Sequence, residues 1–314
     1  MTIFRLALRR LAWSIPLAFV ASLVAFVLIA LLPGDAARAL VGRNATDAQL
    51  EEVRAELGLH EPLWLQYSRW LQSAVQGDLG DSMLSRQPVT SLLNGRLEPS
   101  LSLIVGATLV ALAVGVALGI RGARHGPVGR VVDAGSIVGL AVPDFWLGLV
   151  LIVVFAVQLR LLPPTGYAPV ADGLGAWLRS IALPVCTLAV PATAIIAKQT
   201  RDAMSTALAR PYVRTLRAAG ISERAIVFRH ALRNAAIPVL TVVGLIFIGA
   251  LGGTVAVESV FAIPGLGSTA VSATANRDLP LIQGVVVYFT LIVIAINLLV
   301  DLAYGYFDPR IRVR

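Results

Sequence analysis

The chain has 314 residues, of which 57% are hydrophobic and only 14% are charged, and its mean hydropathy is +0.80. A soluble protein carries roughly 25% charged residues, so this composition excludes an ordinary soluble globule, which would expose too many apolar side chains. The net charge of +8 does not indicate nucleic-acid binding, because the cations fall between apolar runs and form no basic groove interleaved with aromatic residues.

Six apolar runs predict membrane-spanning helices. Each has 17 to 24 residues, close to the roughly 20 that a helix needs to cross a bilayer. The runs cover residues 11–32, 101–120, 134–157, 181–197, 235–257 and 282–304. The first run is too long for the apolar part of a signal peptide, so we expect a retained helix. The sequence therefore predicts an all-α integral membrane protein with six transmembrane helices in one domain, residues 1–314.

The positions of arginine and lysine predict the orientation of these helices. If the N-terminus is cytosolic, 17 of the 26 basic residues are cytosolic and nine are outside. The cytosolic segments are 1–10, 121–133, 198–234 and 305–314, and the outside segments are 33–99, 159–180 and 258–281. Six of the nine outside cations lie in 33–99, where nine acids outnumber them. Since basic residues favour the cytosolic side, both termini are expected there.

The extracytoplasmic segment 33–99 is expected to be helical. Thr46 and Gln49 have the spacing of a capping box, Gly58 is expected to stop the helix that follows, and Pro62 can open a second one. The apolar stripes of these two helices consist of Leu50, Val53 and Leu57 and of Trp64, Tyr67 and Leu71. The segment is therefore interpreted as two amphipathic helices on the membrane face or on a partner, with substrate docking as the alternative.

Two polar residues inside the apolar runs are candidates for the lining of a solute path. Asp144 lies near the middle of the third run, directly after Pro143, where an ionised carboxylate is costly. It either lines the path or is a protonated or paired carboxyl at a kink. Asn297, in the sixth run, either lines the path or forms a hydrogen bond between helices.

The 198–234 loop has the pattern of two helices joined by a turn, and it carries eight cations. A helical pattern runs out of the fourth apolar run to Ala219, and Gly220 is expected to stop it. Ser222 followed by Glu223 is typical of the start of a second helix. Tyr212, Val213 and Leu216 form an apolar patch beside the turn. A loop lying on anionic lipid would need neither feature, so we expect it to dock into a groove on another protein.

Motifs for catalysis and metal binding are missing from the sequence. There is no Gly-x-x-x-x-Gly-Lys-[Ser/Thr] phosphate loop, so the chain is not expected to hydrolyse ATP. His60, His125 and His230 all fall between the apolar runs and have no metal-ligand spacing. Cys186 is the single cysteine, which excludes an internal disulfide. We therefore expect no enzyme activity, no metal site and no cofactor in this chain.

Several segments together resemble the permeases of ATP-binding-cassette importers, in the dipeptide, oligopeptide and nickel branch. They are residues 58–67, 77–82, 212–223, 228–234, 257–267, 276–280 and 308–312. They follow the family's order over nearly the whole chain, and the long segment after the first span resembles the first of the two permeases in such systems. Two departures are His60, where the family usually has Asp or Asn, and Glu98-Pro99-Ser100, which replaces a more apolar opening to the second span. The broader importer signature has Glu-Ala-Ala before the loop glycine, where this chain has Arg214-Thr215-Leu216, as is typical of this branch.

The resemblance implies a type I importer membrane fold in the bacterial cytoplasmic membrane and a set of partners. These are a second homologous permease forming a heterodimer, two cytosolic ATPase domains that bind ATP and Mg, and an extracytoplasmic solute-binding protein. The 198–234 loop would be the cytosolic coupling loop. Its expected ATPase-coupling residues are Tyr212, Val213, Arg214, Thr215, Leu216, Arg217, Ala218, Ala219, Gly220, Ile221 and Ser222.

The resemblance also implies an outer gate and a substrate class. The gate candidates are Phe261, Pro264, Gly265, Leu266 and Gly267. The expected solutes are di- and oligopeptides, with a nickel chelate, glutathione or haem as alternatives. A secondary transporter is a further alternative, although no internal repeat is visible and Asp144 is the only central ionisable residue. An integral-membrane enzyme lacks a catalytic constellation.

Overall fold

The computed structural model describes residues 3–31, 38, 46–56, 58, 60–124 and 126–307, and every regular element in these residues is a helix. The only other paired backbone there is an isolated β-bridge between Asp81 and Pro88. The chain divides into two compact units. Unit 1 contains the described residues of 1–10, 99–263 and 295–314, and unit 2 those of 11–98 and 264–294.

Five helical stretches are long and apolar enough to cross a membrane, and each covers one of the predicted runs. They contain α1 (Ile3–Ala30), α5 (Val89–Arg124), α8 (Leu174–Leu208), α11 (Leu232–Val260) and α13 (Leu279–Phe307). In α1 and α13 only 11% of the apolar window is buried within the chain, as expected where lipid or a partner subunit replaces water, whereas in α8 the share is 56%. With the third run counted as one broken span, the described residues hold the six spans that the sequence predicts.

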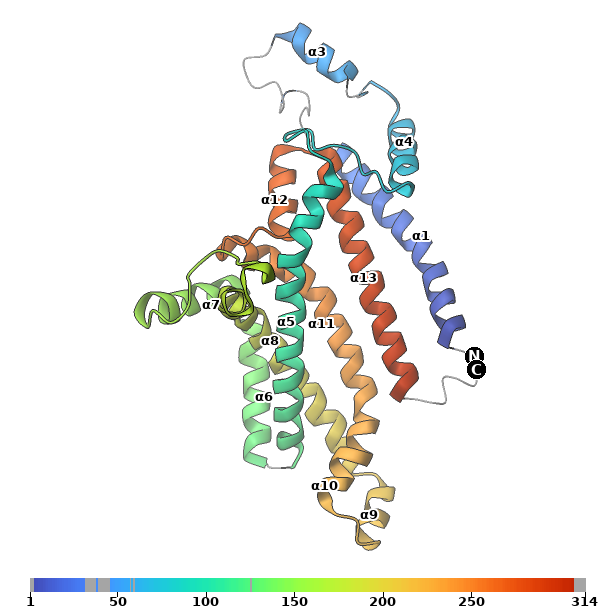
Figure 1. Cartoon of the computed structure of the whole chain (residues 1–314). Coiled ribbons are helices and arrows are strands. Elements are labelled where there is room, and N and C mark those ends of the chain that lie inside the picture. The colour runs from blue at the N-terminus through green and yellow to red at the C-terminus, as the bar shows by residue number, and fades with distance from the viewer. Residues whose placement is uncertain are drawn as a thin grey trace. The chain divides into compact units, whose positions relative to one another are not determined.

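The third run forms a helix that is broken near Pro143. It divides into α6 (Gly126–Ala141) and α7 (Asp144–Leu151), and α7 continues into a π-helix, η1 (Ile152–Gln158). The two arms are bent by 103°, and Figure 1 shows α7 turned away from the direction of α6. The cause is Pro143, which has no N–H to donate and is extended, with ψ 137°. Proline also disfavours the helical conformation in the residue before it.

Helix α8 forms the centre of unit 1. It packs against α6, α7 and α11, and fourteen of its residues are buried. Glycines let α5 approach it closely: a Cβ at Gly115 would lie 2.8 Å from Ile196, and one at Gly119 would lie 2.5 Å from Thr200. Such small residues allow the close helix contacts typical of membrane bundles.

Unit 2 contains the predicted outer helices, α3 (Asp47–Glu56) and α4 (Leu63–Val75), together with α12 (Leu266–Asn276). The capping box is confirmed, because Thr46 N donates to Gln49 Oε1 at 3.0 Å and Gln49 N donates to Thr46 Oγ1 at 3.4 Å. Leu57 and Leu59 lie outside the described residues. In α4, Tyr67 is buried within the chain, whereas Trp64 is 71% exposed.

Tyr67 holds the buried face of α4. Its hydroxyl shares a 2.9 Å hydrogen bond with Ser22 on α1, and its ring packs edge-on against Phe19 and Phe26. These contacts explain why α4 turns Tyr67 inward, while Trp64, three residues earlier, stays on the surface.

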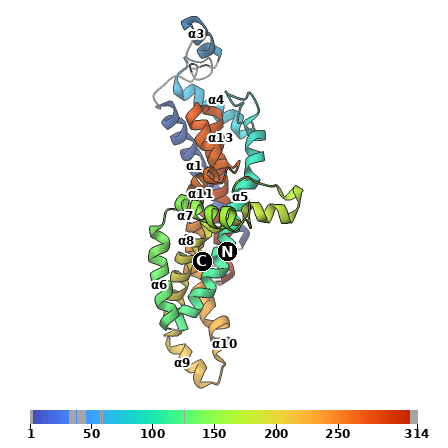
Figure 2. The same ribbon diagram turned by 90° about the vertical axis from the view of Figure 1, so that its left-hand side faces the viewer.

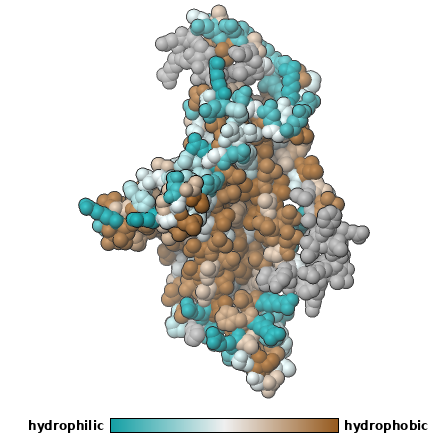
Figure 3. Space-filling model, in the orientation of Figure 1, coloured by the Kyte–Doolittle hydropathy of each residue, from teal (hydrophilic) through white to brown (hydrophobic). Residues whose placement is uncertain are grey.

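The surface of unit 1 is apolar along its spans. Figure 3 shows hydrophobic side chains over the length of the helices, and more hydrophilic ones around α9 (Pro211–Ala218) and α10 (Glu223–Ala225). Both views place these two short helices beyond the ends of α8 and α11 (Figures 1 and 2). The 198–234 loop therefore projects from the apolar part of unit 1.

Candidate functional site

The centre of the 198–234 loop is a helical elbow, residues 210–231. It contains α9, α10 and a π-helix, η3 (Ile226–Ala231), that runs directly into α11. The prediction of one helix from the fourth span to Ala219 is wrong, because α8 ends at Leu208 and α9 begins at Pro211. Arg210 is extended, with ψ 146°, since it precedes a proline. Proline at the first position of α9 loses no hydrogen bond there.

Gly220 ends α9, as the sequence predicts. Its φ is +79°, in the left-handed region that favours glycine. Its N–H donates to the carbonyl of Arg217 at 3.0 Å, and the N–H of Ile221 donates to that of Leu216 at 3.1 Å. This pair of bonds is a Schellman motif, which satisfies the last carbonyls of the helix. The predicted cap is also confirmed, because Ser222 Oγ accepts from Ala225 N at 3.4 Å.

Three contacts hold the elbow together. Val213 is fully buried, and Asn234 Nδ2 on α11 donates to the hydroxyl of Tyr212 at 3.0 Å. Across the glycine turn, Arg217 Nε lies 2.6 Å from Glu223 Oε1. The Glu223 carboxylate raises the pKa of Arg217, so this guanidinium stays charged. The elbow is thus attached to the start of α11 as a stiff unit.

The exposed surface of the elbow differs from the predicted apolar patch. Val213 lies in the interior, and Tyr212 and Leu216 are half-buried. The exposed members of the predicted coupling set are Arg214, Thr215, Arg217, Ala218, Ala219, Gly220 and Ser222. The one large apolar side chain exposed within 210–231 is Phe228, at 56%. The sequence analysis did not select Phe228. The two residues before it, Ile226 and Val227, are buried, so on a helix Phe228 falls on the outward face.

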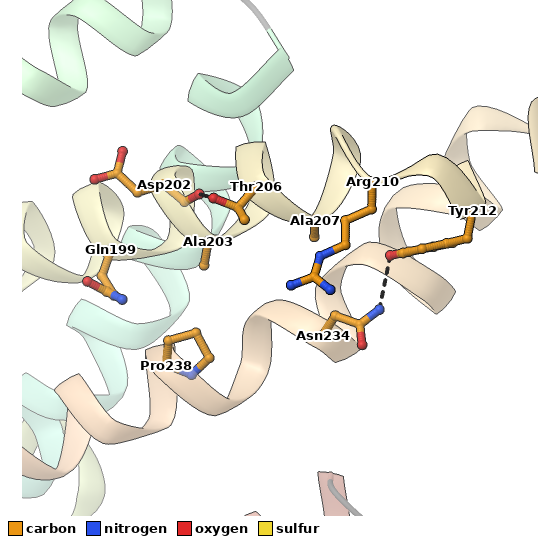
Figure 4. Close-up of a pocket in the computed structure, with 9 residues that line it drawn as sticks. All are labelled: Gln199, Asp202, Ala203, Thr206, Ala207, Arg210, Tyr212, Asn234 and Pro238. Carbon is orange, nitrogen blue, oxygen red and sulfur yellow. Dashed lines mark hydrogen bonds between the residues drawn. The ribbon is translucent and has the colours of Figure 1, made fainter. Parts of the chain in front are cut away.

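A polar cleft of about 460 Å³ lies at the base of the elbow. Figure 4 shows it between the last turns of α8 and the first turns of α11, with the Tyr212–Asn234 hydrogen bond on one side. It is lined by Gln199, Asp202, Ala203, Thr206, Ala207, Arg210, Tyr212, Asn234 and Pro238. The α8 members recur every three or four residues and so occupy one helical face.

Asp144 lies at the break of the third span rather than inside a continuous helix. It is the first residue of α7 and is half-buried. Its carboxylate faces Gly253 on α11, where an added Cβ would lie 3.3 Å from Asp144 Oδ2. A carboxylate in the first turn of a helix is favoured by the unpaired N–H groups there, which gives a physical reason for this residue.

Asn297 is exposed on α13, and no hydrogen bond from its side chain is present within the described part of the chain. The predicted bond between helices is therefore not made among the described residues. Asp144 and Asn297 remain path candidates on separate helices.

The outer-gate candidates fall into both units. Phe261, in unit 1, is buried: its carbonyl accepts from Gly166 N at 2.8 Å, and Gly148 makes room for its ring. In unit 2, Gly265 precedes α12, where its carbonyl accepts from Thr269 Oγ1 at 2.7 Å. Pro264, Leu266 and Gly267 also belong to unit 2, and Leu266 is fully buried.

The Gly166–Phe261 bond ties the outer connection between spans three and four to the end of α11. This connection includes a short 3₁₀ turn, η2 (Val170–Asp172), and borders an open cavity of about 860 Å³ that contains the side chains of Arg160 and Arg179. Arg179 Nη2 donates to the carbonyl of Leu161 at 3.1 Å.

Asp278, in unit 2, is a buried residue that sequence reasoning missed. It is 2% exposed, and its carboxylate accepts from the hydroxyl of Ser82, from Met83 N at 3.1 Å and from Leu281 N at 3.3 Å. The 77–82 and 276–280 segments, singled out separately by their resemblance, therefore meet at one carboxylate. Nothing in the local pattern signals a pairing of residues 196 positions apart.

A metal centre has no candidate among the described residues, where no three side chains of His, Cys, Asp or Glu gather. His125 and the 308–312 tail, which the resemblance includes, lie outside the described residues.

Comparison with known families gives two matches that together cover nearly the whole chain. Residues 111–313 match the family described as "Binding-protein-dependent transport system inner membrane component". Residues 3–104 match the family described as "Binding-prot-dependent transport system membrane comp, N-term".

Curated relatives match over a similar length. A probable peptide ABC transporter permease protein of Sinorhizobium fredii is 42% identical over 97% of this chain and 98% of the relative. A putative peptide transport system permease protein of Brucella abortus is 38% identical over 98% of both chains. A glutathione transport system permease protein of Escherichia coli is 40% identical, also over 98% of both.

Proposed function

The chain belongs to the inner membrane components of binding-protein-dependent transport systems, and we propose that it imports short peptides into the cytoplasm with energy from separate ATPase subunits. It is a multi-pass permease subunit of the bacterial cytoplasmic membrane, with the type I importer membrane fold. The peptide substrate is inferred from relatives named as peptide permeases, 38–42% identical over nearly the whole chain.

The observation that carries the proposal is the elbow. It is capped at both ends of its glycine turn, attached to α11 by Tyr212 and exposes cations beyond the apolar part of unit 1. We propose that an ATPase subunit with bound ATP and Mg grips this surface from the cytosol. Closure of two ATPase domains would then move α8 and α11 as rigid elements.

The remaining partners follow from the same proposal. A second homologous permease would complete the path, and an extracytoplasmic solute-binding protein would deliver the peptide. Asp144 is the candidate for meeting the peptide's ammonium group along the path. Phe261 and the 264–267 turn are the candidates for the outer gate.

The proposal is tested by uptake into proteoliposomes that contain this chain, the second permease and their ATPase subunits. Peptide uptake is expected only when both ATP and the binding protein are supplied. Uptake that persists without the ATPase subunits would instead support a gradient-driven secondary transporter.

The substrate class is tested separately on the binding protein, by competition with a panel of di- to hexapeptides, glutathione, haem and a nickel chelate. Glutathione is included because one relative at 40% identity is named for its transport. Displacement by several short peptides is expected. If glutathione alone displaces the bound probe, glutathione replaces peptides as the proposed solute.

A further inference from the structure

Helices α6 and α8 are joined by a cluster of charges near their expected cytosolic ends. Asp133 on α6 forms ion pairs with Arg201 and, at 3.2 Å, with Lys198 on α8. Lys198 is the only lysine of the chain, and it also lies 2.9 Å from Asp202, one turn further along α8. We call Asp133, Lys198 and Arg201 the clamp, because these three residues connect two helices.

The surroundings of Arg201 are shaped to receive its side chain. A Cβ at Gly129 would lie 3.0 Å from Arg201 Nε, and one at Gly122 would lie 3.3 Å from Arg201 Cδ. These glycines lie at the start of α6 and near the end of α5. Arg201 therefore occupies a space that any larger residue at Gly129 would reduce, which is unusual for a surface ion pair.

The clamp lies between the elbow and the broken third span. Arg201 precedes Arg210, where the elbow begins, by nine residues. The seven residues that follow Arg201, up to the end of α8 at Leu208, are helical, and at about 1.5 Å per residue they cover about 10 Å. On the other side, α6 leads from Asp133 to the 103° bend and to Asp144. Helices α6 and α8 also pack against each other, and the clamp adds ion pairs to this contact.

We propose that the clamp makes α6 follow α8 when the elbow moves, so that ATPase closure reaches the broken third span. The inference rests on the function proposed above. Asp133 acts as a positioning residue and touches no solute. Its side chain is 41% exposed, with Lys198 at 43% and Arg201 at 25%. Ion pairs this exposed contribute little to stability, so their loss should change coupling far more than folding.

The test compares variants of Asp133 in the reconstituted importer. Asp133→Asn removes the charge that holds both cations, and it is expected to lower peptide uptake per ATP hydrolysed by about 2- to 30-fold, the range for residues that carry coupling between sites. Asp133→Glu keeps the carboxylate and should retain most of the coupling. Asp202→Asn is the matched control: it removes one carboxylate from the same lysine but leaves α6 attached.

A cross-link supplies a second readout. A Cβ at Gly139 would lie 2.9 Å from the Cβ of Ala194, so cysteines at these positions of α6 and α8 are close enough to join after a small shift. In a Cys186→Ser background, the oxidised pair Gly139→Cys and Ala194→Cys should still transport, because the two helices move together. The same cross-link should restore coupling to Asp133→Asn.

Three outcomes have separate meanings. If Asp133→Asn equals wild type, or if Asp202→Asn is equally impaired, the clamp does not carry the movement. Loss of uptake on oxidation, recovered by reductant, would show that α6 must slide on α8 and would also overturn the inference. If the wild-type complex shows no ATP-dependent uptake at all, the proposed function itself fails.

Discussion

Gly220 determines the geometry of the elbow through its backbone. An added Cβ at Gly220 would meet nothing within 4 Å, so space does not restrict the residue at this position. The φ of +79° does restrict it. A β-branched residue in this region costs about 1–2 kcal/mol or more. Gly220→Val is therefore expected to leave membrane insertion intact and to reduce peptide uptake per ATP hydrolysed in proteoliposomes.

The control for this prediction is Gly220→Asn, because asparagine tolerates the left-handed region. Gly220→Asn should lose much less coupling than Gly220→Val, although it too adds a side chain where glycine has none. Equal transport by wild type and Gly220→Val would argue against the elbow as the coupling element.

Asp278 is expected to matter for stability. Asp278→Ala leaves the Ser82 hydroxyl and the Met83 and Leu281 N–H groups without their buried acceptor. Loss of such charge-assisted bonds costs about 3 kcal/mol. Thermal unfolding of the detergent-solubilised chain should occur at clearly lower temperature, and protease should cut the 77–88 segment faster. Asp78→Ala, which removes a single exposed bond to Gly80, should change both measurements much less.

At the scale of elements, the attachment of α9 to α11 can be tested by removing the hydroxyl of Tyr212. Tyr212→Phe removes the bond from Asn234, at an expected cost of about 1 kcal/mol in stability. It should also lower uptake per ATP, because the elbow then moves less faithfully with α11. Tyr304→Phe is matched to it: it removes a tyrosine bond to Thr241 on the same helix but away from the elbow. Similar loss of coupling in both variants would contradict a specific role for Tyr212.

The elements also show what can be derived from sequence. Gly220 and Ser222 were predictable because a glycine stop and a serine cap act through neighbouring backbone groups. Pro143 indicated a disturbance, but its bend of 103° depends on how α7 packs against α8 and α11. The hydrophobic pattern of the third run is the same for a straight and a broken helix, so periodicity could not separate them.

Side-chain roles were less predictable than helix boundaries. Val213 was predicted to belong to an apolar patch that contacts a partner, but it is the buried centre of the elbow. Phe228 is the apolar residue that is exposed. Both assignments depend on the direction in which α9 returns toward α11, which is set by the break at Arg210. The interaction of Asp278 with Ser82 is likewise a product of tertiary folding.

At the scale of the whole molecule, the charge distribution predicts which side each loop faces. In a Cys186→Ser background, Ser222→Cys is expected to react with a membrane-impermeant maleimide only in inside-out vesicles, and Thr165→Cys only in right-side-out vesicles. Both positions are exposed. The Cys186→Ser parent, which has no cysteine, measures the background. Labelling of Ser222→Cys in right-side-out vesicles would reverse the topology.

The break at Arg210 and the cap at Ser222 have a consequence for how such permeases diversify. Residues 210–223 have their own helix start, their own stop and an internal ion pair between Arg217 and Glu223. Exposed positions such as Arg214 and Ala218 can therefore change with the ATPase partner while the membrane helices keep their packing, and solute preference can change without altering that partner. Grafting residues 210–223 from a related permease, with Val213 and Tyr212 retained, should redirect ATPase choice while leaving the transported solute the same.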